Sequence, residues 1–453
     1  MKILIAGAGK VGKALTKELS GEGHDLTLVD VRSDVLEDAL EKYDVITYEG
    51  NSASKTSLEE AGIEDMDVFI AVTDADEVNL LSCVTAKALN ENVHCIARIR
   101  DPEYVEQAYS MRDTFHLSLV INPEKQAAME IARILKYPGF LKRETFAKAH
   151  VEIVELKLNE KSRLCDVQLS NLQDVTRAQV LICTVLRDGN AIMPGGDFVL
   201  KKGDRLFVTG DPEELHKLLQ NIGIITMPVR HVLLGGGSRI AYYLAQELGK
   251  SGISSSIIEM DQKKCVELSQ KLPDTTIVHG DISDHSVLDS EDIGKYDAFV
   301  SLTGLDEVNI VASAYADLMG VRQIVTKVGR GSNSRLLDSL PIGSVISPKD
   351  LCTMHIVRYV RAIQQGEGAA LTIHKIADGQ AEAIEFTVDE ETKHVDEPLK
   401  DVKIRKNILI NSIGHGVHTE IPNGDSSFHV GDTVVVVTDG DTDVRELNDI
   451  FEA

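Results

Sequence analysis

Residues 2–12 read KILIAGAGKVG, an apolar strand that runs directly into a loop with glycines at Gly7, Gly9 and Gly12. Gly7 allows a tight turn, Gly9 lets an anion approach the backbone, and Gly12 lets the following helix pack closely on the strand. The next apolar run ends at Asp30. Strand, glycine loop, helix, strand and acid in this order predict the first βαβ unit of a parallel, doubly wound nucleotide-binding sheet.

The glycine loop is the first predicted binding site. Free N–H groups at a helix N-terminus bind a pyrophosphate, so we expect contacts from the whole loop: Gly7, Ala8, Gly9, Lys10, Val11 and Gly12. Asp30 is expected to accept hydrogen bonds from ribose hydroxyls and to repel a 2′-phosphate, which favours NAD(H), ATP or ADP over NADP. Arg32 either covers the adenine or is a solvated charge. Gly50 and Asn51 either line the adenine end through their backbone or only make a turn.

Polar residues also follow the later strands of this unit. Thr73, Asp74 and Asn79 come after the fourth predicted strand, and Arg98 ends the fifth. Ligands of such sheets bind at the carboxyl edge, where these residues are expected. Asn79 either faces this edge or only belongs to the cap and first turn of the next helix. A guanidinium there suits a terminal phosphate, and a structural salt bridge from Arg98 to a nearby acid is the other interpretation. The predicted strands are residues 3–6, 25–29, 45–48, 68–72, 93–98 and 119–121.

The same unit recurs about 230 positions further along the chain. HVLLGGGSRI at residues 231–240 repeats the strand and glycine loop, and LTGLDEVN at residues 302–309 answers VTDADEVN at residues 72–79. We align Gly235 and Gly237 with the first two glycines of the motif, which places Ile240 in the third position. Because a branched side chain there pushes the helix from its strand, we expect either weaker occupancy or an empty cradle. The second predicted site comprises Gly235, Gly237, Ser238, Arg239, Glu259, Asp281 and Thr303.

A second component follows each of these units. It is mostly β-prone with period-2 stretches, and Gly203-Asp204 in the first copy corresponds to Gly431-Asp432 in the second. We expect a small sheet with a terminal helix in each copy. The predicted fold class is α/β, with two Rossmann-like doubly wound parallel sheets, each followed by a small α+β subdomain. The predicted domains are residues 1–140, 141–227, 228–366 and 367–453.

The composition indicates soluble globular domains with an acidic surface. Apolar residues make up 43% and charged residues 26%, which excludes a disordered or fibrous chain. The formal net charge of −25 repels nucleic-acid phosphates, so we expect no nucleic-acid partner. No apolar run approaches the roughly 18 residues that cross a bilayer, and we expect no secretion signal. Six scattered cysteines without a CxxC pair fit a reducing cytoplasm, and we expect each thiol to be a buried apolar group.

These patterns lack the chemistry of an enzyme. A dehydrogenase needs a general acid or base near the nicotinamide, usually a histidine. His150, His216, His415 and His418 have no counterparts between the copies, and we interpret them as isolated surface or core residues. The sequence carries no HExxH, GxSxG or P-loop motif. We therefore expect a nucleotide sensor without catalytic or metal-binding residues, and an NAD-dependent oxidoreductase is the alternative.

The residues quoted so far resemble a known family. The glycine loop, Asp30, the block at residues 72–79, IARIR at residues 96–100 and their duplication are similar to the TrkA family over essentially the full length. Its members are cytosolic regulatory subunits of Trk-type bacterial potassium uptake, built from tandem RCK (also called KTN) domains. The resemblance identifies the first component with the RCK N-terminal Rossmann domain and the second with the RCK C-terminal subdomain.

The resemblance also implies a mechanism and partners. It implies a ring, commonly a homotetramer, docked on the inner face of the cell membrane beneath a TrkH-like potassium-translocating subunit. Binding of NAD(H) and of ATP or ADP then opens or closes the ion pathway. A freestanding nucleotide sensor that regulates another transporter is a further alternative. By resemblance, the nucleotide-holding residues are Gly7, Gly9, Gly12 and Asp30, with Arg98 at phosphate and Gly235, Gly237 and Glu259 in the second pocket.

Overall fold

The two copies of each domain type fold into the same compact unit. The computed structural model describes residues 1–112, 114–136, 142–146, 151–159, 162–222, 228–329, 337, 340–364, 370–416, 418–440, 442 and 444–452. The contacts divide it into two compact units, Met1–Ala132 with Arg230–Val360 and Arg133–Val229 with Arg361–Ala453. The first unit holds both parallel sheets and the second holds both small sheets. Along the chain, the duplicated segments therefore belong alternately to the first and to the second unit.

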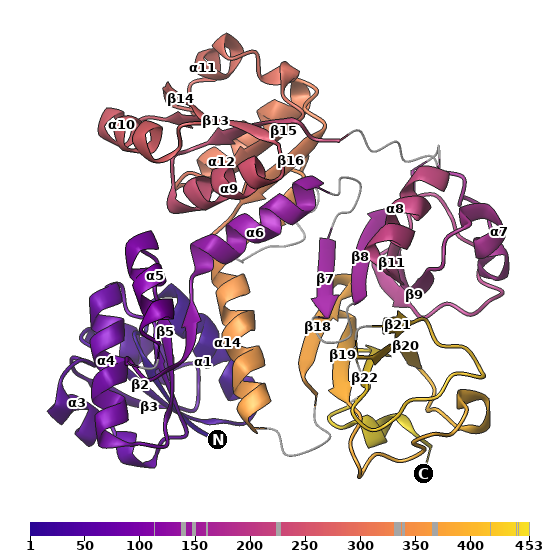
Figure 1. The fold of residues 1–453 in the computed structure, drawn as a ribbon, viewed down its shortest axis with the longest axis horizontal. Helices are drawn as coiled ribbons and strands as arrows, with labels where there is room; N and C mark the ends of the chain where they lie inside the picture. Colours follow the sequence, from indigo (N-terminus) through magenta and orange to yellow (C-terminus); the bar gives the residue numbers. More distant parts are fainter. Residues whose placement is uncertain are drawn as a thin grey trace. The chain divides into compact units, whose positions relative to one another are not determined.

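Two six-stranded parallel sheets with the same strand order form the first unit (Figure 1). The first sheet runs β3-β2-β1-β4-β5-β6 and the second β14-β13-β12-β15-β16-β17, which confirms the predicted Rossmann-like class. All six strands predicted for the first copy are present, with ends within two residues. The strands are β1 (Lys2–Ala6), β2 (Asp25–Asp30), β3 (Ile46–Glu49), β4 (Val68–Ala71), β5 (His94–Arg98), β6 (Leu117–Ile121), β12 (His231–Gly235), β13 (Ser254–Glu259), β14 (Thr276–His279), β15 (Ala298–Ser301), β16 (Gln323–Lys327) and β17 (Ser344–Ile346).

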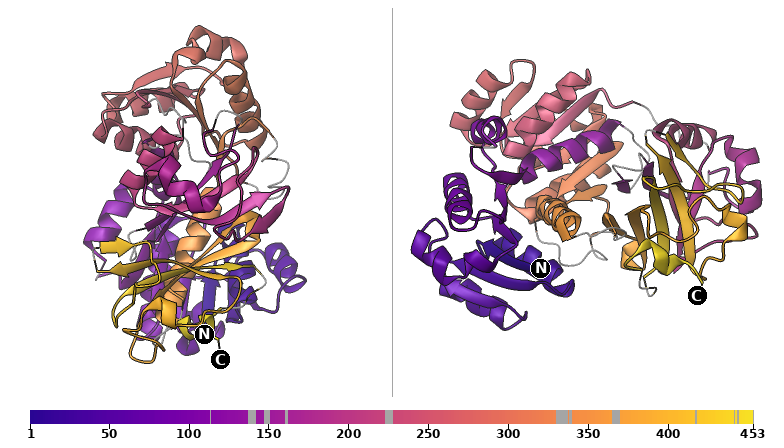
Figure 2. Two further views of the ribbon diagram at one scale, coloured as in Figure 1. Left: turned by 90° about the vertical axis from the view of Figure 1, so that its right-hand side faces the viewer. Right: turned by 60° about the horizontal axis from the view of Figure 1, so that its bottom comes forward.

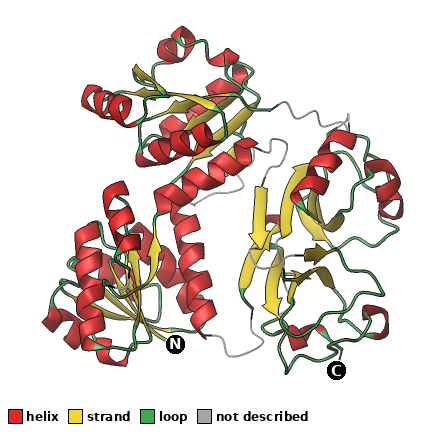
Figure 3. Cartoon of the chain, viewed as in Figure 1, coloured by secondary structure: helices red, strands yellow, loops and turns green. Residues whose placement is uncertain are grey.

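Helices cover the faces of these sheets (Figure 3). Every residue of β4 is buried, as expected for a central parallel strand covered on both sides. Helix α1 turns Val11, Leu15 and Leu19 toward the sheet at helical spacing. The helices are α1 (Lys10–Gly21), α2 (Ser33–Leu40), α3 (Lys55–Glu60), α4 (Asp76–Leu89), α5 (Pro102–Ser110), α6 (Pro123–Lys136), α9 (Arg239–Lys250), α10 (Gln262–Lys271), α11 (His285–Ser290), α12 (Asp306–Leu318) and α14 (Pro348–Gln364).

The second unit contains two five-stranded antiparallel sheets. Figure 2 shows their strands in magenta and in orange to yellow. Their orders, β10-β9-β11-β8-β7 and β18-β19-β22-β20-β21, are the same sequence of equivalent strands read from opposite edges. The strands are β7 (Lys142–Phe146), β8 (Val151–Lys157), β9 (Leu181–Arg187), β10 (Asn190–Ile192), β11 (Arg205–Gly210), β18 (Thr372–Ile376), β19 (Ala381–Thr387), β20 (Ile408–His415), β21 (His418–Glu420) and β22 (Thr433–Asp439).

The two small sheets share one core. Phe146, Cys183 and Phe207 of the first sheet pack in one apolar cluster with Ala383 and Val435 of the second. Burial of apolar surface on both inner faces drives this pairing. Thus each small sheet covers the apolar face of the other.

Polar contacts fix the relation of the two small sheets. Thr209 Oγ1 lies 2.8 Å from Asn411 Oδ1 in a buried hydrogen bond. Arg205 bridges the buried carboxylate of Glu155 and the carboxylate of Asp378 in the other copy. These directional bonds fix the register that apolar burial alone leaves free.

The predicted terminal helix occurs in only one copy. The first small subdomain carries α7 (Leu172–Thr176) and ends in α8 (Pro212–Asn221), whose N-cap Asp211 accepts from the N–H groups of Glu213 and Glu214. The second ends in a short 3₁₀ turn, η6 (Leu447–Ile450), so the prediction of a second terminal helix is wrong. A single turn buries Leu447 and Ile450 against the sheet, which replaces the apolar face of a longer helix.

Some of the sequence predictions concern residues outside the described ranges. The predicted domain boundaries fall beside residues 141, 227 and 365–369, which lie outside them, as does His150. These boundaries stay predictions. All six cysteines are free, and Cys165 is partly exposed whereas the other five are buried. None of the described helices combines the length and apolarity needed to span a membrane.

Truncation of Phe207 to alanine tests the shared core of the small sheets. Phe207 is buried in the cluster built from both copies, so we expect a loss of about 3–5 kcal/mol in the free energy of unfolding of this unit. Chemical denaturation followed by circular dichroism measures it. The exposed Val430 is the control, and Val430→Ala is expected to change the same quantity by less than about 0.5 kcal/mol. Equal costs for both variants would contradict a shared core.

Candidate functional site

The first glycine loop is held by close backbone approaches that only glycine allows. Gly7 has φ +99° and donates from its N–H to Val29 O at 2.8 Å. A Cβ on Gly12 would lie 1.9 Å from Gly7 O, so the first turn of α1 packs against the loop at a distance that no other residue allows. A Cβ on Gly9, the N-cap of α1, would meet no atom within 4 Å. The loop therefore leaves open space above Gly9, at the N–H groups that face an anion.

Asp30 supports this loop from the end of β2. Its Oδ2 accepts from the N–H of Ala8 at 2.7 Å, and its Oδ1 accepts from the N–H and Nε of Arg32 at 3.0 and 3.3 Å. The Arg32 side chain is half exposed, and its pKa is raised by the hydrogen bond to Asp30. Arg32 thus pairs with Asp30 at the rim of the loop. Lys10 is exposed beside it, whereas Val11 packs inward.

Asn79 holds together the ends of two neighbouring strands. Its Oδ1 accepts from Thr73 N at 2.8 Å and Thr73 Oγ1 at 2.7 Å, while its Nδ2 donates to Arg98 O at 2.8 Å. Asn79 is fully buried, so its side chain positions Thr73 and Arg98 beneath the edge. The second copy repeats the arrangement with Asn309, Thr303 and Lys327.

A cation lies at the same place in each copy, the buried Arg98 in the first and the partly buried Lys327 in the second. Arg98 Nη2 donates to Thr73 O at 2.7 Å and approaches the exposed Asp74 carboxylate at 3.4 Å. Among the described residues, Arg98 Nε has no hydrogen-bond partner, and burial lowers the pKa of this guanidinium. Lys327 Nζ donates to Thr303 O at 2.6 Å, and desolvation lowers its pKa as well. A desolvated cation with a spare donor at this edge fits an anionic ligand group.

The second glycine loop corrects our alignment by one residue. Gly236, with φ +106°, donates to Ile258 O, as Gly7 does to Val29 O. Gly235 is instead the last residue of β12 and pairs with Ile258 and Ser301. Ser238 is the N-cap of α9, in the place of Gly9. The third position is therefore Ala241, not Ile240, and Ile240 is buried in the place of Val11.

Glu259 does in the second loop what Asp30 does in the first. Its Oε2 accepts from Gly237 N at 2.7 Å and its Oε1 from Asp261 N at 2.8 Å. A Cβ on Gly237 would come within 2.6 Å of Leu268 and 2.9 Å of the Glu259 carboxylate, so a larger residue there would have to displace these side chains. The longer acid thus reaches the same N–H that Asp30 reaches.

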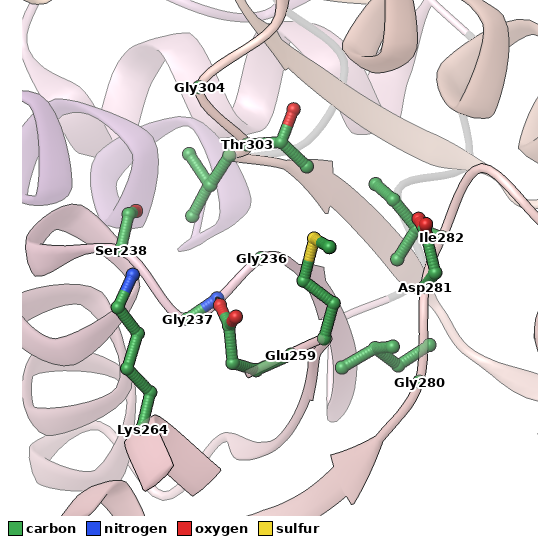
Figure 4. Close-up of a pocket in the computed structure, with 13 residues that line it drawn as sticks. Gly236, Gly237, Ser238, Glu259, Lys264, Gly280, Asp281, Ile282, Thr303 and Gly304 are labelled. Carbon is green, nitrogen blue, oxygen red and sulfur yellow. The ribbon is translucent and has the colours of Figure 1, made fainter. Parts of the chain in front are cut away.

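A pocket of about 190 Å³ opens over this second loop (Figure 4). Of the predicted residues, Gly237, Ser238, Glu259, Asp281 and Thr303 line it. Gly235 and Arg239 do not, and Arg239 instead lines a neighbouring pocket of about 450 Å³. The pocket is also lined by residues that were not predicted from the sequence: Gly236, Ile258, Met260, Lys264, Gly280, Ile282, Leu302 and Gly304.

Two of the missed residues carry a clear physical meaning. Gly236 was hidden in a run of three glycines, where only the backbone conformation shows which residue turns. Lys264 reaches the loop from α10 and supplies a cation at the mouth of the pocket (Figure 4). A basic residue in the first turn of the helix after Glu259 was the sequence feature that could have revealed it.

Asn51 and Asp281 lie at equivalent turns after the third strand of each sheet. Asn51 Oδ1 accepts from Ala53 N at 3.0 Å, and Asp281 Oδ1 accepts from Ser283 N at 2.9 Å. Both side chains therefore stabilise their own turns, and Asp281 also lines the pocket over the second loop.

Charged residues of both copies face one another within the first unit. Asn122 Nδ2, just before α6, donates to Tyr243 Oη on α9 at 3.0 Å. Burial raises the pKa of the neighbouring Glu124 carboxyl, which the charges of Arg100, Arg98 and Arg239 oppose. Charges of both copies, Arg98 from the first and Arg239 from the second, thus act on this one carboxyl.

Comparison with known proteins agrees with this architecture. The TrkA-N domain matches residues 3–123 and 232–348, and the TrkA-C domain matches residues 153–223 and 383–452. The chain belongs to the TrkA family. A Trk system potassium uptake protein TrkA homolog of Archaeoglobus fulgidus is 31% identical over the full length of both chains. TrkA of Vibrio alginolyticus is 29% identical over 100% of this chain and 99% of its own.

Solved RCK structures share the fold of this TrkA-family chain. The GsuK RCK domain superposes with a TM-score of 0.63 at 16% identity, covering 97% of this chain and 92% of its own. The GsuK channel bound to NAD gives a TM-score of 0.62 at 16% identity, covering 97% and 76%. These RCK structures and this chain thus share one fold.

The close packing at Gly12 can be tested by adding one methyl group. Gly12→Ala places a Cβ against Gly7 O, so we expect a loss of about 3 kcal/mol in the free energy of unfolding, at the upper end for overpacking. Gly9→Ala adds the same methyl to open space and is expected to cost less than about 1 kcal/mol. Urea denaturation of both variants measures the difference. Similar losses of unfolding free energy in Gly12→Ala and Gly9→Ala would contradict a close contact between Gly12 and Gly7 O.

Proposed function

We propose that this chain is the cytosolic regulatory subunit of a Trk-type potassium uptake system, in which NAD(H), ATP or ADP bound at the glycine loops gates a TrkH-like membrane subunit. The carrying observation is a pair of preformed loops, each with its acid already bonded to the loop backbone. Family membership supports the transport role, and a GsuK structure with NAD and another with ADP support the choice of ligands.

The first loop is the stronger candidate for a dinucleotide. Gly12 brings α1 against the strand, and open space above Gly9 receives the pyrophosphate. Asp30 keeps carboxylate lone pairs for ribose hydroxyls and opposes a 2′-phosphate. In the second loop Ala241 replaces the third glycine, a far smaller change than a branched residue. Nucleotide binding there is accordingly part of the proposal, with Lys264 toward phosphate.

Electrostatic linkage within the first unit gives the two loops a way to influence each other. Lys327 of the second copy is affected by the charges of Glu124 and of Lys10 at the first loop. A phosphate that arrives at either loop changes this field and the balance of charge around Glu124. Binding at one loop therefore alters the affinity of the other, which is the reciprocity that allosteric coupling requires.

Nucleotides act on the ring by shifting its population of shapes. A shift from 1:99 to 99:1 requires about 5.5 kcal/mol of differential binding. Four equivalent sites in a homotetramer provide this at about 1.4 kcal/mol each, within the usual range of coupling energies. The proposed mechanism needs no chemical change of the nucleotide, so the proposed subunit is not an enzyme. It is proposed to act at the inner face of the membrane, beneath its TrkH-like partner.

Loss of nucleotide binding is expected for two first-loop variants that keep the fold. Asp30→Ala removes the ribose acceptor, and Gly9→Leu fills the open space over the loop. Calorimetric titration of the full-length chain with NADH and ADP is expected to show dissociation constants raised at least about tenfold. Glu259→Ala is the matched variant of the second loop and assigns each nucleotide to its loop. Unchanged titrations for all three variants would refute the binding sites.

Ion flux tests the gating role directly. The chain is expected to co-purify with a TrkH-like subunit, and potassium flux in proteoliposomes is expected to change when NADH, NAD, ATP or ADP is added. Asp30→Ala is expected to abolish the response to its nucleotide. Steady oxidation of NADH with a hydroxy or carbonyl metabolite would instead establish the oxidoreductase. Nucleotide binding without association or flux would favour a freestanding sensor.

A further inference from the structure

Two histidines and an aspartate meet at one end of the second small sheet. His415 is the last residue of β20, and His429 and Asp432 lie on the turn that leads into β22. One ligating atom from each residue lies within 4.8 Å of the other two. His415 Nδ1 is 2.7 Å from Asp432 Oδ2, which also accepts from the backbone N–H of His429 at 2.7 Å. The sequence interpretation of His415 as isolated is therefore wrong, because sheet closure brings distant residues to it.

The cluster is open to solvent and bordered by further acids. The His415 side chain is 32% exposed and that of His429 55%, whereas that of Asp432 is 10% exposed. Glu420 Oε1 lies 3.9 Å from His415 Nε2, and Asp396 hydrogen-bonds to His429 Nδ1. A cation from solvent can reach the imidazoles directly, while the carboxylate that anchors them is fixed by the fold.

The first small subdomain shows what this position does without histidines. There the buried Asp204 accepts from Nε and Nη2 of Arg187, both at 2.7 Å. Lys201 takes the place of His429, because its N–H donates to Asp204 at 2.8 Å as that of His429 does to Asp432. The same backbone frame thus holds a closed salt bridge in one copy and an imidazole pair in the other.

The exchange removes a permanent counter-charge from a buried acid. Arg187 stays protonated at any physiological pH and forms two parallel bonds to Asp204. An imidazole carries no permanent charge, so a bound cation would take the place of the arginine as the counter-charge of Asp432. Since the first copy shows that the frame accepts arginine and lysine, the fold itself does not require histidines here.

We propose that His415, His429 and Asp432 bind a divalent transition-metal cation of the Zn²⁺ class. Two imidazole nitrogens and one carboxylate form a three-ligand set that leaves a fourth position for water or Glu420. Tetrahedral bonds of about 2.1 Å separate ligand atoms by about 3.4 Å, so small side-chain rotations bring the three atoms into place. Imidazole ligands favour Zn²⁺ over Mg²⁺ or Ca²⁺, which prefer oxygen donors.

The metal would join two segments of the second subdomain. His415 precedes the turn into β21, and His429 and Asp432 belong to the segment before β22. A bound cation cross-links these segments, and it stabilises the folded state because the unfolded chain has no preformed site. The inference stands apart from the nucleotide sites and does not depend on them.

Spectroscopy of the full-length, chelator-treated chain without a histidine tag tests the site. Co²⁺ is expected to give the visible absorption of a tetrahedral complex at one ion per chain, and Zn²⁺ is expected to displace it. Competition against a chromophoric chelator is expected to give a micromolar or tighter Zn²⁺ dissociation constant. Zn²⁺ is also expected to raise the midpoint of thermal unfolding.

The double variant H415R/H429K installs the residues of the first copy and is the matched control. Because the first copy folds with Arg187 and Lys201, the variant is expected to keep its circular dichroism and lose at least about 100-fold in Zn²⁺ affinity. His216→Ala, on an exposed face of α8, is expected to leave binding unchanged. Absence of the Co²⁺ band, millimolar affinity, or equal binding by wild type and the double variant would overturn the proposal.

Discussion

The conformation of each glycine loop depends on a carboxylate that accepts a hydrogen bond from the backbone of the loop. Asp30 bonds to Ala8 N and Glu259 to Gly237 N, both at 2.7 Å. These bonds hold the loop in the conformation that leaves its N–H groups free for an anion. The acid therefore performs a structural task before any ribose arrives, and the cradle is formed without its ligand. Preorganisation of this kind lowers the ordering cost of binding.

The two copies keep the same buried hydrogen-bonding residues but differ in the cationic side chains beside them. Asn79 and Asn309 make the same buried bonds, yet the cation they position is Arg98 in one copy and Lys327 in the other. In the small subdomains the buried acid stays while its arginine partner becomes a histidine. Backbone-bonded groups are costly to change because an orphaned buried partner loses its hydrogen bond. Charged neighbours at the rim are free to differ, which makes the copies chemically unequal.

The two chemically different copies of each domain type lie in the same compact unit. The two Rossmann copies form one compact unit, in which Asn122 bonds to Tyr243 and charges from both copies surround Glu124. The two small sheets form another unit around a common apolar core. Under the proposed function, a ligand bound to one copy would act on a unit that contains the other copy, whereas separate domains would leave each site independent.

The sequence by itself determined the strands, both glycine loops, the acids that follow them and the duplication. These features follow from local spacing, since apolar runs and glycine positions act within one βαβ unit. Only the tertiary structure decided that Gly236 is the turning glycine, because it is the one of the three adjacent glycines that has a positive φ and lies against the backbone of Thr303. It also decided the loss of the last helix in the second copy and the meeting of His415 with Asp432. Those outcomes depend on sheet closure and on which apolar faces pack together, and no local pattern encodes them.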